Sequence, residues 1–184
     1  MPGGRIEMMR SMPRNVEIKA RVVGWEEMLQ RAAALADGPV QELQQEDVFF
    51  TVPRGRLKLR TQNGTSELIY YFRENASGPR ESSYLCIPIP DAASARQMLA
   101  LVHGQRGIIR KTRRLYIAGQ TRIHLDRVEN LGDFLELEVV LRDRQSVEEG
   151  AAIARGLMGR LGIREEHLVD RAYIDLGTVA RPVK

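Results

Sequence analysis

The sequence predicts an α+β fold in which about eight antiparallel strands are joined mostly by hairpins and interrupted by a few helices. Three observations support this prediction. Short segments alternate apolar and charged residues with a period of two, which places the two kinds of side chain on opposite faces of a strand. Turn-forming residues separate these segments, and three other stretches have the apolar spacing of helices. Strands of this kind build a sandwich, an open sheet backed by helices, or a barrel.

Each strand is expected where the period-two pattern recurs. The pattern is clearest over residues 15–22, where every second residue is apolar. Pro53-Arg54-Gly55 predicts a turn, Asn63-Gly64 is a strong hairpin signal, and Ala118-Gly119-Gln120 predicts a further tight connection. The expected strands are residues 15–23, 42–50, 56–62, 66–73, 81–89, 107–117, 121–128 and 134–142.

Helices are expected over residues 25–36, 91–103 and 146–161. Asp91 is placed to cap the second helix, and Ser146 with Glu149 has the spacing of a capping box at the third. Apolar residues at helical spacing give each helix a face to bury. Those of the second helix are Met98, Leu99 and Val102.

The length of 184 residues favours one domain, expected over residues 14–176. Residues 1–13 lack the apolar core of a signal peptide and are expected to be a disordered leader, with Met12 as an alternative start, and residues 177–184 a C-terminal tail. No run approaches the roughly 20 apolar residues that cross a bilayer. The only cysteine, Cys86, excludes an intrachain disulfide and suits a reducing, cytoplasmic setting.

The net charge of +4 favours an anionic partner, either nucleic acid or a phosphorylated small molecule. Only four of the 28 basic residues are lysines, namely Lys19, Lys58, Lys111 and Lys184. A genome whose codons favour arginine would explain this ratio. So would a phosphate ligand, because guanidinium groups form paired hydrogen bonds with oxyanions.

Basic and acidic residues segregate by strand, which is typical of a cavity with a cationic wall and an acidic wall. The basic positions are Arg56, Lys58, Arg60, Lys111 and Arg113, with Arg73 and Arg122 as further candidates. The acidic positions are Glu17, Asp126, Glu136 and Glu138. Enclosed cations need a compensating anion such as a triphosphate, and carboxylates suit Mg²⁺ or Mn²⁺. The alternative is that both sets form ordinary solvated strand faces.

Other kinds of site find less support. The three histidines are too dispersed for structural zinc. His124 shares a strand face with Arg122 and Asp126 and is expected to be a satisfied structural histidine, with a titrating role beside the site as the alternative. Cys86 is expected in the core. No phosphate-binding loop, nucleophile elbow or dinucleotide fingerprint is present.

Several motifs, in order along the chain, resemble the CYTH, or triphosphate tunnel, family. Asn15-Val16-Glu17-Ile18-Lys19 is similar to its Glu-x-Glu-x-Lys signature. The other motifs are Asp47-Val48-Phe49-Phe50, the run from Pro53 to Arg60, Arg110-Lys111-Thr112-Arg113-Arg114-Leu115-Tyr116, His124-Leu125-Asp126, and the run from Leu131 to Glu138. The resemblance covers roughly residues 14–176 and is greatest to the branch that contains class IV adenylyl cyclases; thiamine triphosphatases are another branch.

The resemblance implies an eight-stranded antiparallel β-barrel, a triphosphate tunnel, with flanking helices and a charged interior. Basic residues would bind the phosphates: Lys19, Arg56, Lys58, Arg60, Arg73, Lys111 and Arg113. Of these, Lys19, Lys111 and Arg113 would be catalytic. Mg²⁺ or Mn²⁺ would be held by Glu17, Asp126, Glu136 and Glu138. The chain departs from the family at Asn15, which replaces the first signature glutamate, and at Tyr71, where a lysine is usual.

The function expected from the resemblance is metal-dependent processing of a nucleoside or organic triphosphate, as in the conversion of ATP to cyclic AMP and pyrophosphate. Hydrolysis of thiamine triphosphate or tripolyphosphate is an alternative. A non-catalytic polyphosphate- or nucleotide-binding module is another, because Asn15 lacks a charge. RNA binding is less favoured, since no aromatic platform interleaves with the basic residues. No membrane partner is expected, and a homodimer is left open.

Overall fold

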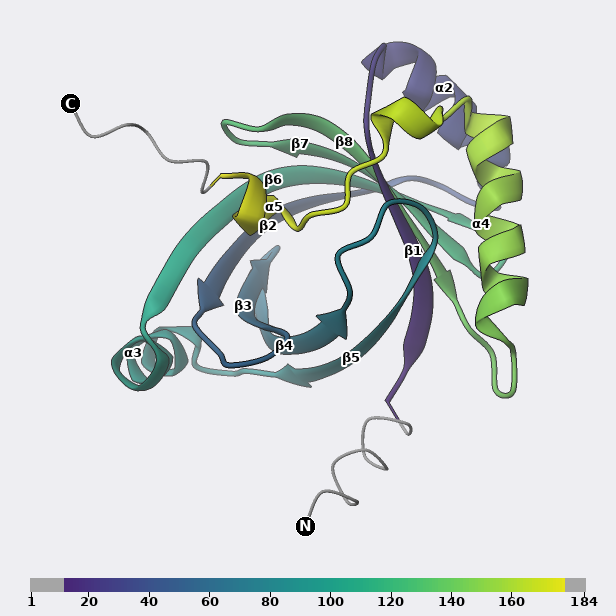
Figure 1. The fold of residues 1–184 in the computed structure, drawn as a ribbon. Helices are drawn as coiled ribbons and strands as arrows, with labels where there is room; N and C mark the ends of the chain where they lie inside the picture. The colour runs from purple at the N-terminus through teal and green to yellow at the C-terminus, as the bar shows by residue number, and fades with distance from the viewer. Residues whose placement is uncertain (1–11, 178–184) are drawn as a thin grey trace, which may run out of the picture.

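The computed structural model describes residues 12–177, which form a closed barrel of eight antiparallel strands (Figure 1). The strand order around the barrel is β1-β5-β4-β3-β2-β6-β7-β8. The strands are β1 (Arg14–Arg21), β2 (Gln41–Phe50), β3 (Arg56–Gln62), β4 (Thr65–Arg73), β5 (Arg80–Pro88), β6 (Gln105–Ala118), β7 (Thr121–Val128) and β8 (Gly132–Val140). Of the three architectures that the strand pattern allowed, a sandwich, an open sheet and a barrel, the structure confirms the barrel. The expected leader, residues 1–13, and tail, residues 177–184, lie mostly outside the described residues.

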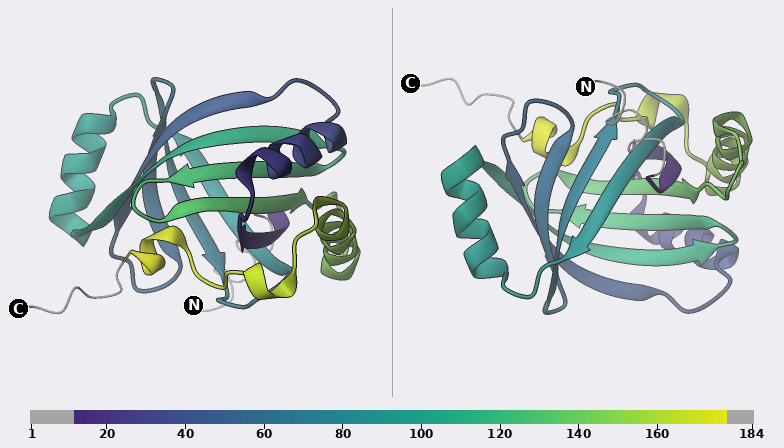
Figure 2. Two further views of the ribbon diagram at one scale, coloured as in Figure 1. Left: turned by 90° about the horizontal axis from the view of Figure 1, so that it is seen from above. Right: turned by 90° about the horizontal axis from the view of Figure 1, so that it is seen from below.

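The helices are α2 (Trp25–Leu35), α3 (Ala92–His103), α4 (Val147–Leu161), the 3₁₀ turn η1 (Glu165–His167) and the short α5 (Tyr173–Leu176). The expected caps are confirmed: Asp91 accepts a hydrogen bond from the Ser94 backbone, and Ser146 and Glu149 form a capping box. Figure 2 shows α3 on the opposite side of the barrel from α2 and α4. In the part of the chain that the structure describes, no helix is long and apolar enough to cross a membrane.

The main apolar core lies outside the barrel. The outward faces of β1, β7 and β8 pack against α2 and α4, through residues such as Ile18, Ile123 and Leu137, all at most 1% exposed. The alternating sequence explains this arrangement, because each strand must bury its apolar face and the helices cover only the outside. The charged faces are therefore left to line the interior.

Two smaller apolar clusters complete the packing. One places Val48, Phe50 and Leu59 of β2 and β3 under α3. The other joins Phe134 and other barrel residues to the C-terminal segment, including Tyr173. The prediction for α3 is wrong at two of its three positions. Leu99 packs on the barrel, but Met98 and Val102 are 63% and 69% exposed, because α3 touches β2 and β3 along a narrow strip.

The Asn63-Gly64 hairpin explains the register of β3 with β4. Both residues have positive φ, 46° and 83°, as a two-residue hairpin turn requires. The register that follows pairs Lys58 with Ile69. A slip of one residue would turn Lys58 out of the barrel, because successive side chains alternate between the two faces.

Candidate active site: a charged tunnel inside the barrel

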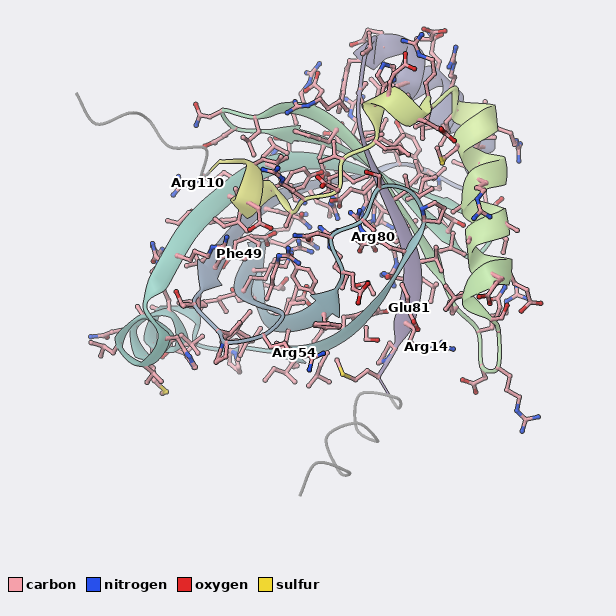
Figure 3. All side chains as sticks on the ribbon, in the orientation of Figure 1. Arg14, Phe49, Arg54, Arg80, Glu81 and Arg110 are labelled. Carbon is pink, nitrogen blue, oxygen red and sulfur yellow. The ribbon has the colours of Figure 1, made fainter. Side chains whose placement is uncertain are left out.

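The barrel encloses a cavity of about 320 Å³. In Figure 3, nitrogen- and oxygen-bearing side chains gather inside the ring of strands. Seven basic and five acidic side chains line the cavity. They are Lys19, Lys58, Arg60, Arg73, Lys111, Arg113 and Arg122, with Glu17, Asp47, Glu67, Glu136 and Glu138. The excess of positive charge in an enclosed space suits a polyanionic ligand.

One arc of this wall, from β3, β2 and β6, is rich in cations. Asp47 of β2 accepts hydrogen bonds from Lys58 Nζ at 2.9 Å and from Arg60 Nε at 2.7 Å. Burial lowers the pKa of Lys58 to about 8, with Arg60 adding to the effect and Asp47 opposing it. Asp47 was not among the site residues expected from the sequence. It belongs to the Asp47-Val48-Phe49-Phe50 motif. Its position in the alternating pattern of the strand could have predicted that its side chain points into the barrel.

A second carboxylate organises the cations of β6 from behind the wall. Asp126 is fully buried and accepts hydrogen bonds from Lys111 at 2.9 Å, from Arg113 at 2.6 Å and from the Tyr173 hydroxyl at 3.0 Å. Burial alone would raise the pKa of Asp126, but Arg113 and Lys111 outweigh it and hold the pKa well below its ordinary value. Asp126 does not line the cavity and its oxygens already have protein donors. This position argues against the metal-ligand role expected for it.

The opposite arc, from β7, β8 and β1, is rich in carboxylates. Glu136 lies 2.7 Å from Lys19 Nζ and 2.7 Å from Arg113 Nη2. These cations, together with His124, hold the pKa of Glu136 well below its ordinary value despite its burial. Lys19 Nζ also lies 3.6 Å from the centre of the Tyr173 ring. Lys19 is therefore fixed between a carboxylate and an aromatic face, facing the cavity.

His124, Glu136 and Glu138 form a group that could hold a divalent cation. One ligand atom of each lies within 4.8 Å of the others. His124 Nδ1 is buried without a hydrogen-bond partner and lies 3.8 Å from each glutamate. Burial lowers the pKa of His124, which favours the neutral imidazole that binds metals. The expectation that His124 is a satisfied structural histidine is therefore wrong, and the residues present fit a metal ion.

Glu17 lies beside this group and is bound by two arginines. Its Oε1 is 2.9 Å from Arg73 Nε and 3.4 Å from Arg80 Nε. Burial is the main reason that the pKa of Glu17 is raised, and the nearby charges of Glu136 and Glu138 add to it. Arg73 Nη1 is buried with no hydrogen-bond partner among the described residues. Arg73 therefore has a donor available for an anion. Arg80 was not among the residues expected from the sequence, because it lies one residue before the expected strand.

The two departures from the family pattern, Asn15 and Tyr71, both line the cavity. Asn15 is two residues before Glu17 on the same strand, and its Oδ1 is buried without a hydrogen-bond partner. That oxygen is neutral, so the site has one formal charge fewer than a glutamate there would give. Tyr71 stands 5.6 Å from Lys58 Nζ, measured to the ring centre, and burial raises the pKa of its hydroxyl.

Two further expectations, for Arg56 and Cys86, differ from the structure. Arg56 does not line the cavity. It binds Asp175 of α5 at 2.8 Å and Asn75 at 2.9 Å, so it anchors the C-terminal segment at the barrel rim. Cys86 is not in the core: it is exposed and faces the cavity, because its strand parity matches that of Ser82 and Tyr84. The other predicted phosphate-binding residues do meet in one cavity, with Glu17, Glu136 and Glu138.

An eight-stranded antiparallel barrel with a charged interior and an external apolar core defines the triphosphate tunnel architecture. The chain belongs to the CYTH domain family, which it matches over residues 13–173. It is 26% identical over 142 residues to the adenylate cyclase CyaB of Aeromonas hydrophila, covering 73% of this chain and 72% of that one.

Solved structures agree with this family membership. The PH1012 protein from Pyrococcus horikoshii OT3 is 30% identical, with a TM-score of 0.76 over 88% of this chain and 98% of that one. HpAC1 from Hippeastrum, named as an adenylyl cyclase with a dominant triphosphatase activity, has a TM-score of 0.61 at 16% identity, over 90% of this chain and 97% of that one. The likeness to HpAC1 shows the fold alone.

Proposed function

We propose that the protein binds a nucleoside or organic triphosphate in this tunnel, together with Mn²⁺ or Mg²⁺, and catalyses in-line displacement at phosphorus. The observation that supports this proposal best is that a cationic arc and the carboxylates Glu136 and Glu138 face each other across one enclosed cavity, with His124 buried beside the two carboxylates. Because of the similarity to CyaB, we favour an adenylyl cyclase that converts ATP to cyclic AMP and pyrophosphate.

The proposed roles of the residues follow from their positions. Lys58, Arg60, Lys111 and Arg113 would neutralise the phosphate oxygens and hold the chain of phosphates extended, while Asp47 and Asp126 orient these cations. Such positioning and charge neutralisation supply most of the catalysis of phosphoryl transfer.

Lys19 and Arg73 would approach the phosphates from the β1–β5–β4 side of the barrel. His124, Glu136 and Glu138, with Glu17 nearby, would hold the metal, which polarises phosphate oxygens when bound. A donor set that mixes an imidazole with carboxylates favours Mn²⁺ over Mg²⁺, because Mg²⁺ prefers an all-oxygen shell.

A substrate panel tests the proposal. ATP, thiamine triphosphate and tripolyphosphate would each be incubated with the protein and Mn²⁺ or Mg²⁺, with cyclic AMP, pyrophosphate and phosphate measured separately. We expect cyclic AMP and pyrophosphate in equal amounts from ATP, faster with Mn²⁺. Lys111→Ala should lose this activity, and Arg110→Ala should keep it, because Arg110 lies on the outer face of the same strand, paired with Glu46.

Each other outcome of the panel has a clear meaning. Release of phosphate without cyclic AMP would replace the cyclase with a hydrolase, an activity described for HpAC1. Binding of tripolyphosphate without any turnover would indicate the non-catalytic module that Asn15 leaves open. Failure of all three compounds to bind would refute the tunnel as a triphosphate site.

The pH dependence of binding gives a further test. Because the pKa of Lys58 is lowered to about 8, its ammonium is lost from the free protein above that pH. If this ammonium binds phosphate, tripolyphosphate affinity should fall about tenfold per pH unit above 8, with uptake of one proton on binding. Isothermal titration calorimetry in buffers of different ionisation enthalpy measures both quantities.

Lys58→Arg is the matched variant for this test, because a guanidinium stays charged throughout the range. Its affinity should fall less steeply with pH than that of the wild type, and the remaining decline would come from Lys19 and Lys111, whose pKa values burial also lowers. An equally steep decline in the variant and in the wild type would show that Lys58 does not contact the ligand.

A further inference from the structure

Two of the eight strands contribute a different kind of surface to the tunnel. β4 and β5 place Ile69 opposite Cys86, and Tyr71 opposite Tyr84, and all four side chains line the cavity. We call these four residues the β4–β5 wall. These four side chains carry no formal charge at neutral pH, and they lie between Glu67 and Arg73 of β4, which also line the cavity.

Only Tyr71 of the wall packs against other apolar protein groups, at the edge of the cluster that contains Phe49. Ile69, Tyr84 and Cys86 belong to none of the apolar clusters found among the described residues. Over residues 12–177, neither the Tyr71 nor the Tyr84 hydroxyl has a hydrogen-bond partner. Tyr84 is half-buried and Cys86 exposed, so the wall can be reached from solvent. It is an apolar surface with two free hydroxyls inside a polar tunnel.

The wall adjoins the phosphate-binding cations. The register of β3 with β4 places Lys58 directly across from Ile69. Residues paired in this way lie about 5 Å apart, so a group attached to a phosphate at Lys58 reaches the wall without a long linker. A bare polyphosphate would gain nothing from apolar side chains, whereas an aromatic ring can stack on tyrosine and bury apolar area there.

We infer that the β4–β5 wall is the subsite for an aromatic ring carried by the triphosphate, and that it makes the protein selective for ring-bearing organic triphosphates over inorganic or small aliphatic ones. This inference rests on the proposed function, since it assumes that the tunnel holds a triphosphate. The base of a nucleotide and the rings of thiamine both have the required chemistry. The two free hydroxyls are available to the ring nitrogens of either.

Binding measurements with three triphosphate esters test the inference. ATP, thiamine triphosphate and methyl triphosphate would be titrated into the full chain at 4 °C, with Ca²⁺ in place of Mg²⁺ to slow turnover. Methyl triphosphate has the same ester linkage but no ring. The better of the two ring-bearing compounds should bind about tenfold more tightly than methyl triphosphate, as expected for one stacked ring.

Tyr84→Ser removes the ring of Tyr84 and keeps a hydroxyl. This variant should lower the affinity for the ring-bearing ligand about tenfold and change the affinity for methyl triphosphate less than twofold. Leu85→Ser is the matched control, because Leu85 is the next residue of β5, points out of the barrel and is 52% exposed. It should change neither affinity.

The inference is overturned if the wild type binds all three esters with equal affinity. It is also overturned if Tyr84→Ser lowers the affinity for methyl triphosphate as much as the affinity for the ring-bearing ligand. In either case the tunnel still binds triphosphates and the proposed function stands. If none of the three esters binds, the proposed function itself fails, so the two failures are distinguishable.

Discussion

Replacing Asp126 with asparagine should lower the free energy of unfolding by about 3–5 kcal/mol, because it removes the charge that compensates two buried cations. Asp126 Oδ2 accepts from Lys111, Arg113 and Tyr173 at once. If the amide nitrogen of asparagine took the place of Oδ2, it would face three hydrogen-bond donors and could accept from none of them. If it took the place of Oδ1, it would face the donor Arg113 Nε. Urea denaturation at pH 7, followed by circular dichroism, measures the change.

Asp133→Asn is the control for this prediction. Asp133 pairs with Arg127 at 3.7 Å on the surface, where ion pairs contribute at most about 1 kcal/mol.

The contribution of Asp126 to the free energy of unfolding depends on pH in a definite direction. Because the folded pKa of Asp126 is depressed, its contribution is present above the unfolded pKa of about 4 and is lost as the pH falls below it. An Asp126→Asn protein as stable as the wild type would show that this carboxylate does not organise the tunnel cations.

Glu136→Gln should reduce turnover by a hundredfold or more while the barrel stays folded. The carboxylate is proposed to bind the metal, and it also neutralises Lys19 and Arg113. A glutamine has the same size, so the cavity keeps its shape. The carboxylate charge would stabilise the transition state through the metal, and losing several kcal/mol of this stabilisation corresponds to about a hundredfold lower rate. Electron paramagnetic resonance of Mn²⁺ should show weaker metal binding in the same variant.

Glu42→Gln is the control for Glu136→Gln, because Glu42 forms an exposed ion pair with Arg114 on the outer surface. It should change neither turnover nor Mn²⁺ affinity. Wild-type rates in Glu136→Gln, with normal Mn²⁺ binding, would remove Glu136 from the metal site and with it the proposed mechanism.

Much of the barrel could be predicted because it depends on local patterns. The alternation around Glu17 and Lys19 determines which side chains share a face, and the Asn63-Gly64 turn determines the register of its hairpin. The motifs of the family resemblance then indicated closure of the sheet. These signals act over a few residues, so they can be read without knowing the rest of the chain.

The contributions that were missed come from distant parts of the chain. Tyr173 reaches Asp126, and Asp175 reaches Arg56, only because the C-terminal segment returns to the barrel rim (Figure 1). Such contacts leave no periodic pattern in the sequence. The behaviour of α3 was missed for a related reason: the apolar spacing of Met98 and Val102 suggests burial, but the narrow contact with the barrel leaves them exposed.

The location of the main hydrophobic core has a consequence for how this protein can change over time. Residues such as Ile123 and Leu137 stabilise the shell from outside, so most substitutions on the inner surface do not remove apolar packing. Substrate preference can therefore drift while the scaffold keeps its stability, with Asp126 as an exception. That separation of tasks offers a physical reason why one architecture carries names as different as adenylate cyclase and triphosphatase.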